Sequence, residues 1–256
     1  MVKPKLGIQL YSVRDMCQND FLGTIRQIAE IGYRNAELAG IFGHDPKEVR
    51  KTLQDNGLNA NSAHFGLNLK DPKETSGVRD HVKRQTEIAL ELGIERYVVP
   101  WYPLAEAPTE DDVARFAATL SEASDIVTSA GLEFGYHNHA VEFKQVNGKA
   151  VIDHLMERLP RMGAQFDLGW VKLGGQDPSA YLRKYAGRVS LVHAKDFTAD
   201  GADSAIGLGI VDWDSALAAA EEIGVEYVIV EQEAYEVSSL ESAKRNLAWF
   251  RDRGWA

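Results

Sequence analysis

Short apolar runs alternate along the whole chain with segments in which apolar residues recur every three or four positions. The short runs predict buried strands, and the segments of helical spacing predict amphipathic helices. The predicted strands cover residues 6–13, 33–39, 59–65, 96–101, 133–139, 164–168, 189–194 and 227–231. The helices between and after them are predicted at 20–32, 45–57, 73–92, 109–130, 149–159, from 177 onward, 213–223 and 239–253.

Residues with strong local preferences mark the ends of these helices. Asp45 and Pro46 form an N-cap followed by proline at the first helical position. Thr109 and Asp112 have the spacing of a capping box, with Asp in the place of Glu. Glycines that suit a left-handed C-cap separate the predicted helices from the next strands, and they are Gly32, Gly57, Gly93, Gly131, Gly163, Gly187 and Gly224.

Strict alternation of strand and helix requires a parallel sheet with right-handed crossovers. Eight such units in 256 residues predict an α/β protein with a (β/α)8 TIM barrel, formed as a single domain over residues 1–256. A doubly wound open sheet is the alternative. It is less favoured because no glycine-rich dinucleotide loop follows the first strand.

Composition and charge narrow the classes of function. Apolar residues make up 45% and charged residues 26% of the chain, which is ordinary for a globular protein. The formal net charge of −10 argues against a nucleic-acid partner, because binding to phosphates depends on Lys and Arg. No apolar stretch is long enough for a membrane span, Cys17 is the one cysteine, and no signal peptide is evident. A cytoplasmic location is therefore expected.

The carboxyl ends of the predicted strands carry many polar residues. This end of a (β/α)8 barrel is where active sites lie, and a packed barrel has little use for buried charges that bind nothing. The polar and aromatic residues at these ends are Gln9, Glu37, His64, Trp101, His137, Asn138, His139, Glu142, Asp167, His193, Lys195, Asp196, Glu231, Gln232 and Glu233.

Four of these residues, Glu142, Asp167, His193 and Glu231, come from four successive strand-helix units. Ligands on four neighbouring strands can converge on a single ion. Three carboxylates and one imidazole suit a hard or borderline divalent metal. One divalent metal ion is therefore predicted, with Mn as the first choice and Mg, Co or Zn as alternatives.

Several motifs in a fixed order resemble the sugar phosphate isomerase/epimerase family, whose members have a xylose isomerase-like TIM barrel. The motifs are Gly-Tyr-His-Asn-His-x-x-Glu-Phe, Phe-Asp-Leu-Gly-Trp, Gly-Arg-Val-Ser-Leu-Val-His-Ala-Lys-Asp, Gly-Leu-Gly-Ile-Val-Asp-Trp and Val-Ile-Val-Glu-Gln-Glu. The resemblance covers nearly the whole chain. It implies a metal held by Glu142, Asp167, His193 and Glu231.

One departure from the family pattern concerns the fifth strand. Relatives such as the ketose epimerases carry their metal-binding Glu on that strand, where this chain has Gly135 or His137. Glu142 lies a few residues later in the chain, so its side chain must extend back toward the end of the strand to bind the metal. His137 or His139 is the alternative ligand.

The resemblance implies a metal-dependent sugar isomerase or epimerase that acts on a ketose or keto-sugar through an enediolate. Glu142 and Glu231 are the expected catalytic pair for proton transfer. A small-molecule sugar is the expected partner, without nucleic acid or membrane, and a homodimer is possible. The alternatives are a lyase similar to inosose dehydratases and a non-catalytic sugar-binding barrel. The expected substrate-binding residues are His64, His137, His139, Trp170 and Lys195.

Overall fold

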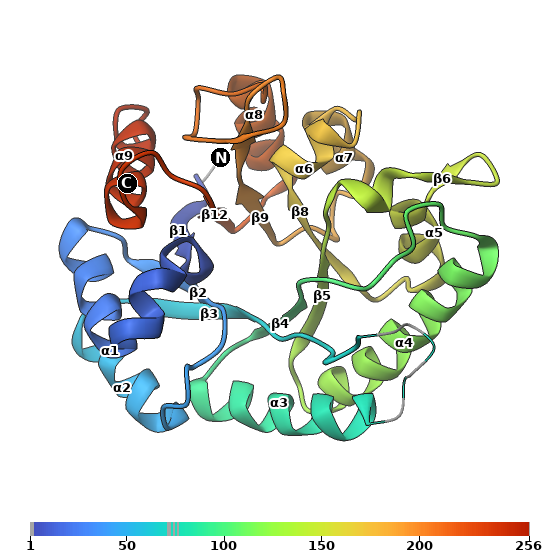
Figure 1. The fold of residues 1–256 in the computed structure, drawn as a ribbon, viewed down its shortest axis with the longest axis horizontal. Helices are drawn as coiled ribbons and strands as arrows, with labels where there is room; N and C mark the ends of the chain where they lie inside the picture. Colours follow the sequence, from blue (N-terminus) through green and yellow to red (C-terminus); the bar gives the residue numbers. More distant parts are fainter. Residues whose placement is uncertain (1–2, 71–72, 74, 76, 256) are drawn as a thin grey trace.

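The computed structural model describes residues 3–70, 73, 75 and 77–255. Within this part of the chain, eight parallel strands form a closed barrel in the order β1-β12-β9-β8-β5-β4-β3-β2 (Figure 1). The predicted (β/α)8 barrel is confirmed. The barrel strands are β1 Lys5–Gln9, β2 Asn35–Leu38, β3 Asn59–His64, β4 Arg96–Val99, β5 Glu133–His137, β8 Gly163–Asp167, β9 Leu191–Ala194 and β12 Tyr227–Val230.

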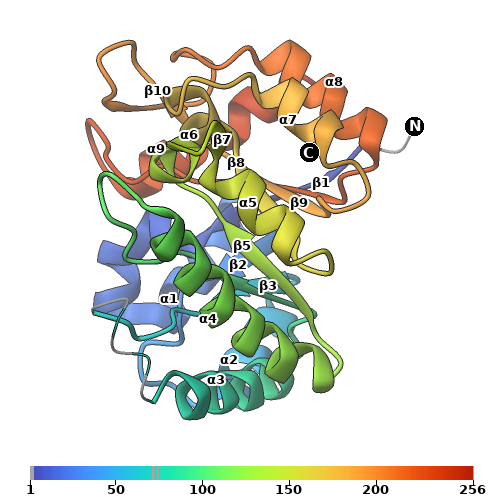
Figure 2. The same ribbon diagram turned by 90° about the vertical axis from the view of Figure 1, so that its right-hand side faces the viewer.

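Helices surround the strands on the outside of the barrel (Figure 1). In the view turned by 90°, the N-terminus and β10 lie on opposite sides of the molecule (Figure 2). Two short 3-10 helices, η1 Leu10–Val13 and η2 Ala140–Phe143, follow β1 and β5. The α-helices are α1 Arg14–Ile31, α2 Pro46–Asp55, α3 Val78–Leu92, α4 Glu110–Ser129, α5 Val151–Arg158, α6 Leu168–Leu173, α7 Pro178–Lys184, α8 Trp213–Ile223 and α9 Ser239–Arg251.

The strands are buried on both faces, as a parallel sheet covered by helices requires. All four residues of β12 and all four of β9 are buried, for example. One face of each strand packs against the helices and the other points into the barrel. Their nearly continuous apolar runs, which predicted the strands, follow from this double burial.

The largest boundary difference lies at the first strand-helix unit. The predicted strand at 6–13 is too long, because β1 ends at Gln9, whose side chain accepts a hydrogen bond from the Tyr11 N–H and starts η1. The helix predicted from Asp20 is confirmed, but further helical residues precede it. Helix α1 begins at Arg14, and Asp20 lies inside it at a kink, where its carboxylate accepts from the Gly23 N–H.

Several short elements were not predicted. Helix α6 follows β8 directly because Asp167 caps it, accepting a hydrogen bond from the Trp170 N–H. The hairpins β6–β7 (Gln145–Val146 and Lys149–Ala150) and β10–β11 (Asp196–Phe197 and Asp203–Ser204) are also additional. Gly163 lies in β8 and does not cap a helix. Of the helix predicted at 73–92, α3 confirms the part from Val78, while residues 74 and 76 lie outside the described residues.

Arg96 ties three strands together at the amino end of the barrel. Its guanidinium group lies 3.0 Å from Glu133 and 2.9 Å from Glu226, which precede or begin β5 and β12. The side chain is 7% exposed, so these partners compensate most of the cost of burying its charge. In the described part of the chain, no helix combines the length and apolar character that crossing a membrane requires.

Candidate metal centre

Four potential metal ligands converge at the carboxyl end of the barrel. His137 ends β5, Asp167 ends β8, His193 lies on β9 and Glu231 follows β12. These four strands are consecutive neighbours in the barrel. One ligand atom from each side chain lies within 4.8 Å of every other, and all four residues are buried. The structure thus brings together three of the four predicted ligands and adds His137.

The donor set fits a divalent cation. The Oδ2 atom of Asp167 is buried and has no hydrogen-bond partner among the described residues, while its Oδ1 atom accepts from the Trp170 N–H. An unpartnered buried carboxylate oxygen is costly unless a cation faces it. Two carboxylates and two imidazoles are ligands that Zn²⁺ and Mn²⁺ both accept.

The pKa directions of His137 and Glu231 agree with this interpretation, whereas those of Asp167 and His193 favour forms that must lose a proton when a cation binds. Burial lowers the pKa of His137, and the nearby His193 and His64 lower it further, so its imidazole is neutral with a free lone pair. Burial raises the pKa of Asp167 to about 7. Burial also opposes ionisation of Glu231, but Lys195 and His193 hold its pKa well below the usual range. Glu231 therefore stays a carboxylate.

Glu37, on β2, contacts one of the four candidate ligands, His193, from across the barrel. Its carboxylate is fully buried and lies 2.5 Å from Nε2 of His193 and 3.1 Å from Nε2 of His64. It also accepts hydrogen bonds from the side-chain amides of Gln9 at 2.8 Å and Gln165 at 2.7 Å. Burial alone would raise the pKa of Glu37, but the charges of His64 and His193 and their hydrogen bonds hold it well below its usual range.

Two carboxylates therefore hold His193 from opposite sides. Burial disfavours its charged form, but Glu37 and Glu231 outweigh this and raise the pKa of His193 to about 10. The Nδ1 atom of His193 lies 3.1 Å from Glu231 and its Nε2 atom faces Glu37. This carboxylate-histidine arrangement is typical of the surroundings of a metal ligand.

A cavity of about 350 Å³ opens beside the four ligands. Two of its aromatic residues, Tyr11 and Trp101, are 42% and 49% exposed, so they form its rim. The described residues that line it are Tyr11, Ala39, His64, Pro100, Trp101, His137, His139, Glu231 and Glu233. Of the predicted substrate-binding residues, the structure therefore brings His64, His137 and His139 to one cavity.

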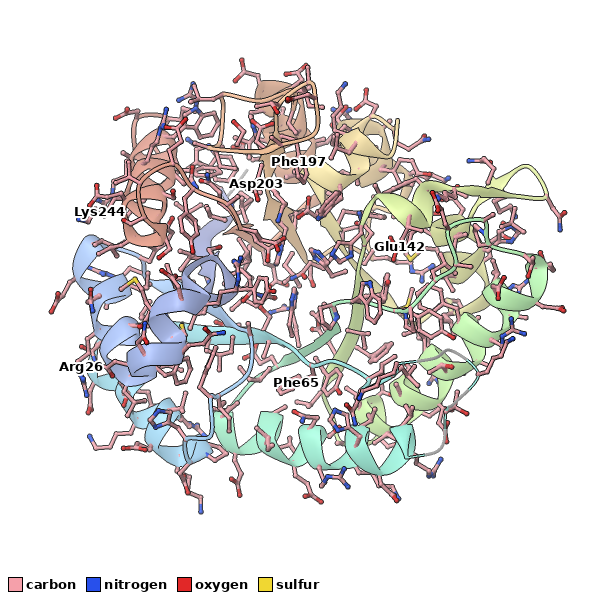
Figure 3. All side chains as sticks on the ribbon, viewed as in Figure 1. Arg26, Phe65, Glu142, Phe197, Asp203 and Lys244 are labelled. Carbon is pink, nitrogen blue, oxygen red and sulfur yellow. The ribbon has the colours of Figure 1, made fainter. Side chains whose placement is uncertain are left out.

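Glu142 does not join the other three predicted ligands. It lies on η2, where its Oε1 atom accepts a hydrogen bond from the Tyr136 hydroxyl at 2.6 Å and its Oε2 atom from the His139 N–H at 2.8 Å. Burial raises its pKa. Figure 3 shows Glu142 beside β5, away from Phe197 and Asp203 of the hairpin β10–β11. Its place in the cluster is taken by His137, which was the alternative on the same strand.

Lys195 and Trp170, the other two predicted substrate-binding residues, are not among the residues that line this cavity. The ammonium group of Lys195 hydrogen-bonds Glu233, lies 3.7 Å from Glu231, and is 1% exposed. It is therefore an internal cation that balances the cluster. Trp170 packs on Phe197 with ring centroids 4.5 Å apart, and its Nε1 atom is buried without a partner among the described residues.

Sequence reasoning missed the roles of Glu37, Gln165 and Glu233. Glu37 and Glu233 stood among the polar strand ends, but nothing along the chain indicated that Glu37 faces His193 across the barrel. Gln165 lies in the middle of β8, and its Oε1 atom is 2.6 Å from His64 and 3.1 Å from His137. A polar residue within an otherwise apolar buried strand was the available signal.

A family model described as the xylose isomerase-like TIM barrel matches residues 25–253. The inosose dehydratase of Geobacillus kaustophilus (strain HTA426) is 28% identical over 193 residues, which are 69% of this chain and 62% of that protein. The chain thus matches less than two thirds of the length of that curated relative.

Solved structures resemble the whole barrel. A sugar phosphate isomerase/epimerase from Parabacteroides distasonis ATCC 8503 superposes with a TM-score of 0.86 at 25% identity, covering 100% of this chain and 96% of that one. The IolI protein with a bound zinc atom superposes with a TM-score of 0.77 at 17% identity, covering 97% of both chains.

Proposed function

Because the chain belongs to the family of xylose isomerase-like TIM barrels, we propose that it is a metal-dependent enzyme that dehydrates a polyhydroxylated ketone. The reaction removes a proton from the carbon next to the carbonyl group and expels a hydroxyl group from the following carbon. The observation that carries the proposal is the convergence of His137, Asp167, His193 and Glu231 beside an open cavity. These four residues would hold the cation.

A bound divalent cation would supply charge stabilisation at the carbonyl oxygen of the substrate. Glu231 serves as the base that takes the proton. Its carboxylate stays ionised beside Lys195, and it lines the cavity. Glu233 lines the same cavity and hydrogen-bonds Lys195. We assign Glu233 to binding the departing hydroxyl group, which receives the proton that Glu231 has taken and leaves as water.

The proposal favours dehydration over the isomerisation or epimerisation that the sequence first suggested. Curated relatives that match the chain are inosose dehydratases, at 28% identity for the protein of G. kaustophilus. The geometry also supports this choice. The carboxylates that line the cavity are Glu231 and Glu233. Both belong to one segment after β12, so they approach the substrate from the same part of the cavity wall.

Isomerisation or epimerisation is the second candidate, because a structure described as a sugar phosphate isomerase/epimerase superposes over the whole chain. Epimerisation needs acid-base groups on two faces of the substrate. His139 is a candidate for the second group because it also lines the cavity. Burial lowers its pKa to about 4, so that its imidazole is neutral near pH 7.

Product analysis distinguishes the candidates. Purified protein, loaded in turn with Mn²⁺, Mg²⁺, Co²⁺ and Zn²⁺, is incubated in deuterated water with a panel of keto-inositols, ketoses and 3-keto-sugars. Dehydration is detected as loss of water by mass spectrometry and as a new unsaturated ketone in the ultraviolet spectrum. Isomerisation and epimerisation are detected as deuterium at a carbon next to the carbonyl group, without loss of mass as water.

We expect Glu231→Gln to lower the rate of the reaction by at least about 100-fold, because a positioned base contributes that much. Glu236→Gln is the matched control, since Glu236 lies in the same loop with a side chain that is 91% exposed. Full activity in Glu231→Gln would contradict the proposed mechanism. Bound metal without turnover or label exchange from any compound would favour a non-catalytic sugar-binding barrel.

A further inference from the structure

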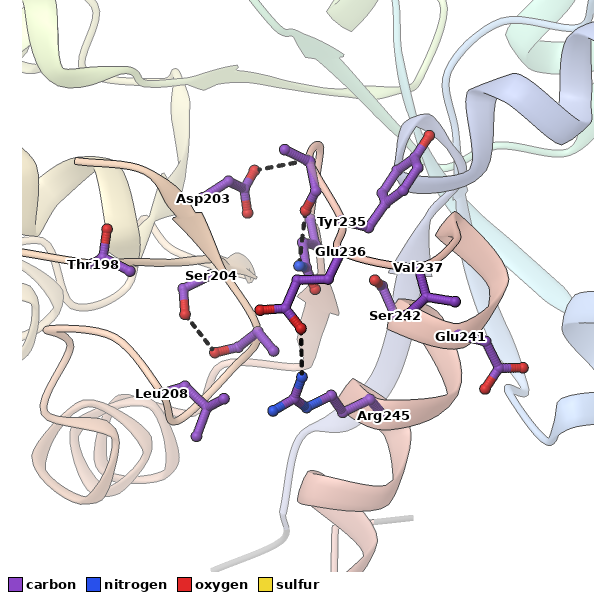
Figure 4. A pocket seen from close by; sticks show the side chains of 13 residues that line it. Thr198, Asp203, Ser204, Leu208, Tyr235, Glu236, Val237, Glu241, Ser242 and Arg245 are labelled. Atoms are coloured by element: carbon purple, nitrogen blue, oxygen red, sulfur yellow. Dashed lines mark hydrogen bonds and ion pairs between the residues drawn. The ribbon is translucent and has the colours of Figure 1, made fainter. Parts of the chain in front are cut away.

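Asp203 connects the hairpin β10–β11 to the segment that follows β12. Its Oδ2 atom accepts hydrogen bonds from the backbone N–H groups of Glu233, at 2.8 Å, and Ala234, at 3.3 Å. Figure 4 shows the bond to Ala234. The side chain is 9% exposed. Its Oδ1 atom is buried and has no hydrogen-bond partner among the described residues.

The segment 231–234 separates two cavities. Glu231 and Glu233 line the cavity of about 350 Å³ beside the metal ligands. Gln232 and Ala234 line a second cavity of about 410 Å³, which Asp203 also lines and which Figure 4 shows. A single extended stretch of backbone therefore forms the wall, and its position determines where the two carboxylates stand.

Asp203 also faces Lys195 within this wall. The Oδ2 atom lies 3.8 Å from the ammonium group of Lys195, which in turn hydrogen-bonds Glu233. Two further hydrogen bonds hold the wall. The Gln232 N–H donates to the Ser12 hydroxyl oxygen at 3.1 Å, and the Arg14 guanidinium group donates to the Glu233 carbonyl at 3.1 Å.

A buried carboxylate is an expensive way to accept two backbone hydrogen bonds, because a neutral amide or hydroxyl oxygen can do the same. Its negative charge also attracts Lys195, the cation that faces it. Asp203 thus contacts Glu233 in two ways. It accepts a hydrogen bond from the Glu233 backbone, and it lies near the Lys195 ammonium group that binds the Glu233 side chain.

We propose that Asp203 is a positioning residue for the reaction: it holds the Glu233 backbone and Lys195 so that the Glu233 carboxylate reaches the substrate cavity. The part that concerns turnover rests on the proposed function. Asp203 does not contact the substrate cavity itself, so its effect passes through Glu233 and Lys195.

The test compares Asp203→Ala and Asp203→Asn with Asp200→Asn. The alanine variant loses both the charge and the acceptor, whereas the asparagine variant keeps an oxygen that can accept from the two N–H groups. Asp200 is the matched control because it lies in the turn of the same hairpin, fully exposed, and hydrogen-bonds Thr198. Circular dichroism and Tm measurements verify that each variant folds.

We expect Asp203→Ala to lower kcat by about 10- to 100-fold, as the loss of a supporting contact does in such sites. KM and the Kd for Mn²⁺ or Zn²⁺ should remain near the wild-type values. Asp203→Asn should fall between alanine and wild type, and Asp200→Asn should match wild type. Wild-type kcat in Asp203→Ala, or a parallel loss of kcat, metal affinity and Tm, would overturn the proposal.

Hydrogen exchange of the peptide that contains residues 231–237, followed by mass spectrometry, provides a second measurement that needs no substrate. Exchange should accelerate in Asp203→Ala and stay unchanged in Asp200→Asn. If the wild-type protein turns over no compound, the proposed function fails, while this measurement still decides the positioning role. Unchanged exchange in Asp203→Ala would refute it.

Discussion

His193 lies between two buried carboxylates, and this fixes which of its nitrogens is available. Glu37 is ionised and can only accept, so Nε2 of His193 must donate to it. The Nδ1 atom faces Glu231, and a cation that binds His193 there would displace the Nδ1 proton. Glu37 therefore orients one of the four candidate metal ligands without belonging to the cluster itself.

We expect Glu37→Gln to weaken the binding of Mn²⁺ or Zn²⁺ by about 10- to 100-fold, the usual cost of changing a carboxylate behind a histidine ligand. A glutamine in this place has nearly the same shape, but its amide can donate to Nε2 and so favour the wrong tautomer. Isothermal titration calorimetry of the metal measures the effect.

Glu142→Gln is the control for this experiment. Glu142 is also fully buried at the carboxyl end of the barrel, but its oxygens are occupied by Tyr136 and the His139 N–H. Its metal affinity should remain near that of wild type. A larger loss in Glu142→Gln than in Glu37→Gln would restore Glu142 as a ligand in place of His137.

Cys17 provides a prediction about pH. The thiol is 2% exposed, and burial, followed by the nearby Asp15, raises its pKa from 9.0 to about 12. The folded state therefore holds this proton more tightly than the unfolded state. The contribution of Cys17 to stability is complete below pH 9 and is lost as the pH rises from 9 toward 12.

Alkylation by iodoacetamide at pH 8.5 should consequently be far slower for the folded protein than for the protein in denaturant, since the thiolate is the nucleophile. Mass spectrometry of timed samples measures both rates. Equal rates in the two states would show that Cys17 is neither buried nor protonated. Urea unfolding of Cys17→Ala should lose the part of the pH dependence above pH 9.

At the scale of elements, regular strands and helices were predictable and the short connecting pieces were not. The apolar run of β12 and the N-cap Asp45 act locally, so the sequence around them is sufficient to predict their structure. The loop after β11 depends on Asp196 of β10, whose carboxylate accepts from the N–H groups of Gly207, Gly209 and Val211. Such a network depends on residues that meet only after folding.

The fifth strand shows the same limit at the site. The sequence predicted a metal ligand near His137 and Glu142, and which of the two lies close to Asp167, His193 and Glu231 depended on local geometry. His137 is the last residue of β5 and joins the cluster, whereas the chain then turns into η2 and directs Glu142 toward Tyr136. The carboxylate-rich pattern of the family favoured Glu142, but the turn into η2 places Glu142 outside the cluster.

At the scale of the whole barrel, contacts between neighbouring strands were predictable and contacts across the barrel were not. Asp167, His193 and Glu231 come from adjacent units, so barrel closure brings them together. Glu37 meets His193 across a separation of 156 residues, from β2 to β9, which are not paired strands. Only the closed barrel shows that this contact exists.

The cluster joins β5, β8, β9 and β12, so a cation bound there should stabilise half of the barrel against unfolding. A ligand that binds only the folded state at 100 times its Kd adds about 2.7 kcal/mol to the free energy of unfolding. For a chain of this length, that corresponds to a rise in Tm of roughly 5–10 °C. Differential scanning calorimetry with EDTA or with Mn²⁺ or Zn²⁺ measures it.

Asp167→Asn should lose most of this rise, because it removes the carboxylate whose Oδ2 atom has no other partner. His154→Gln is the control, since His154 faces the Val146 carbonyl in the β6–β7 region and lies outside the cluster. It should keep the full rise. If Asp167→Asn gained as much from the metal as wild type, the stabilising cation would have to bind elsewhere, and the four ligands at the barrel end would lose their assignment.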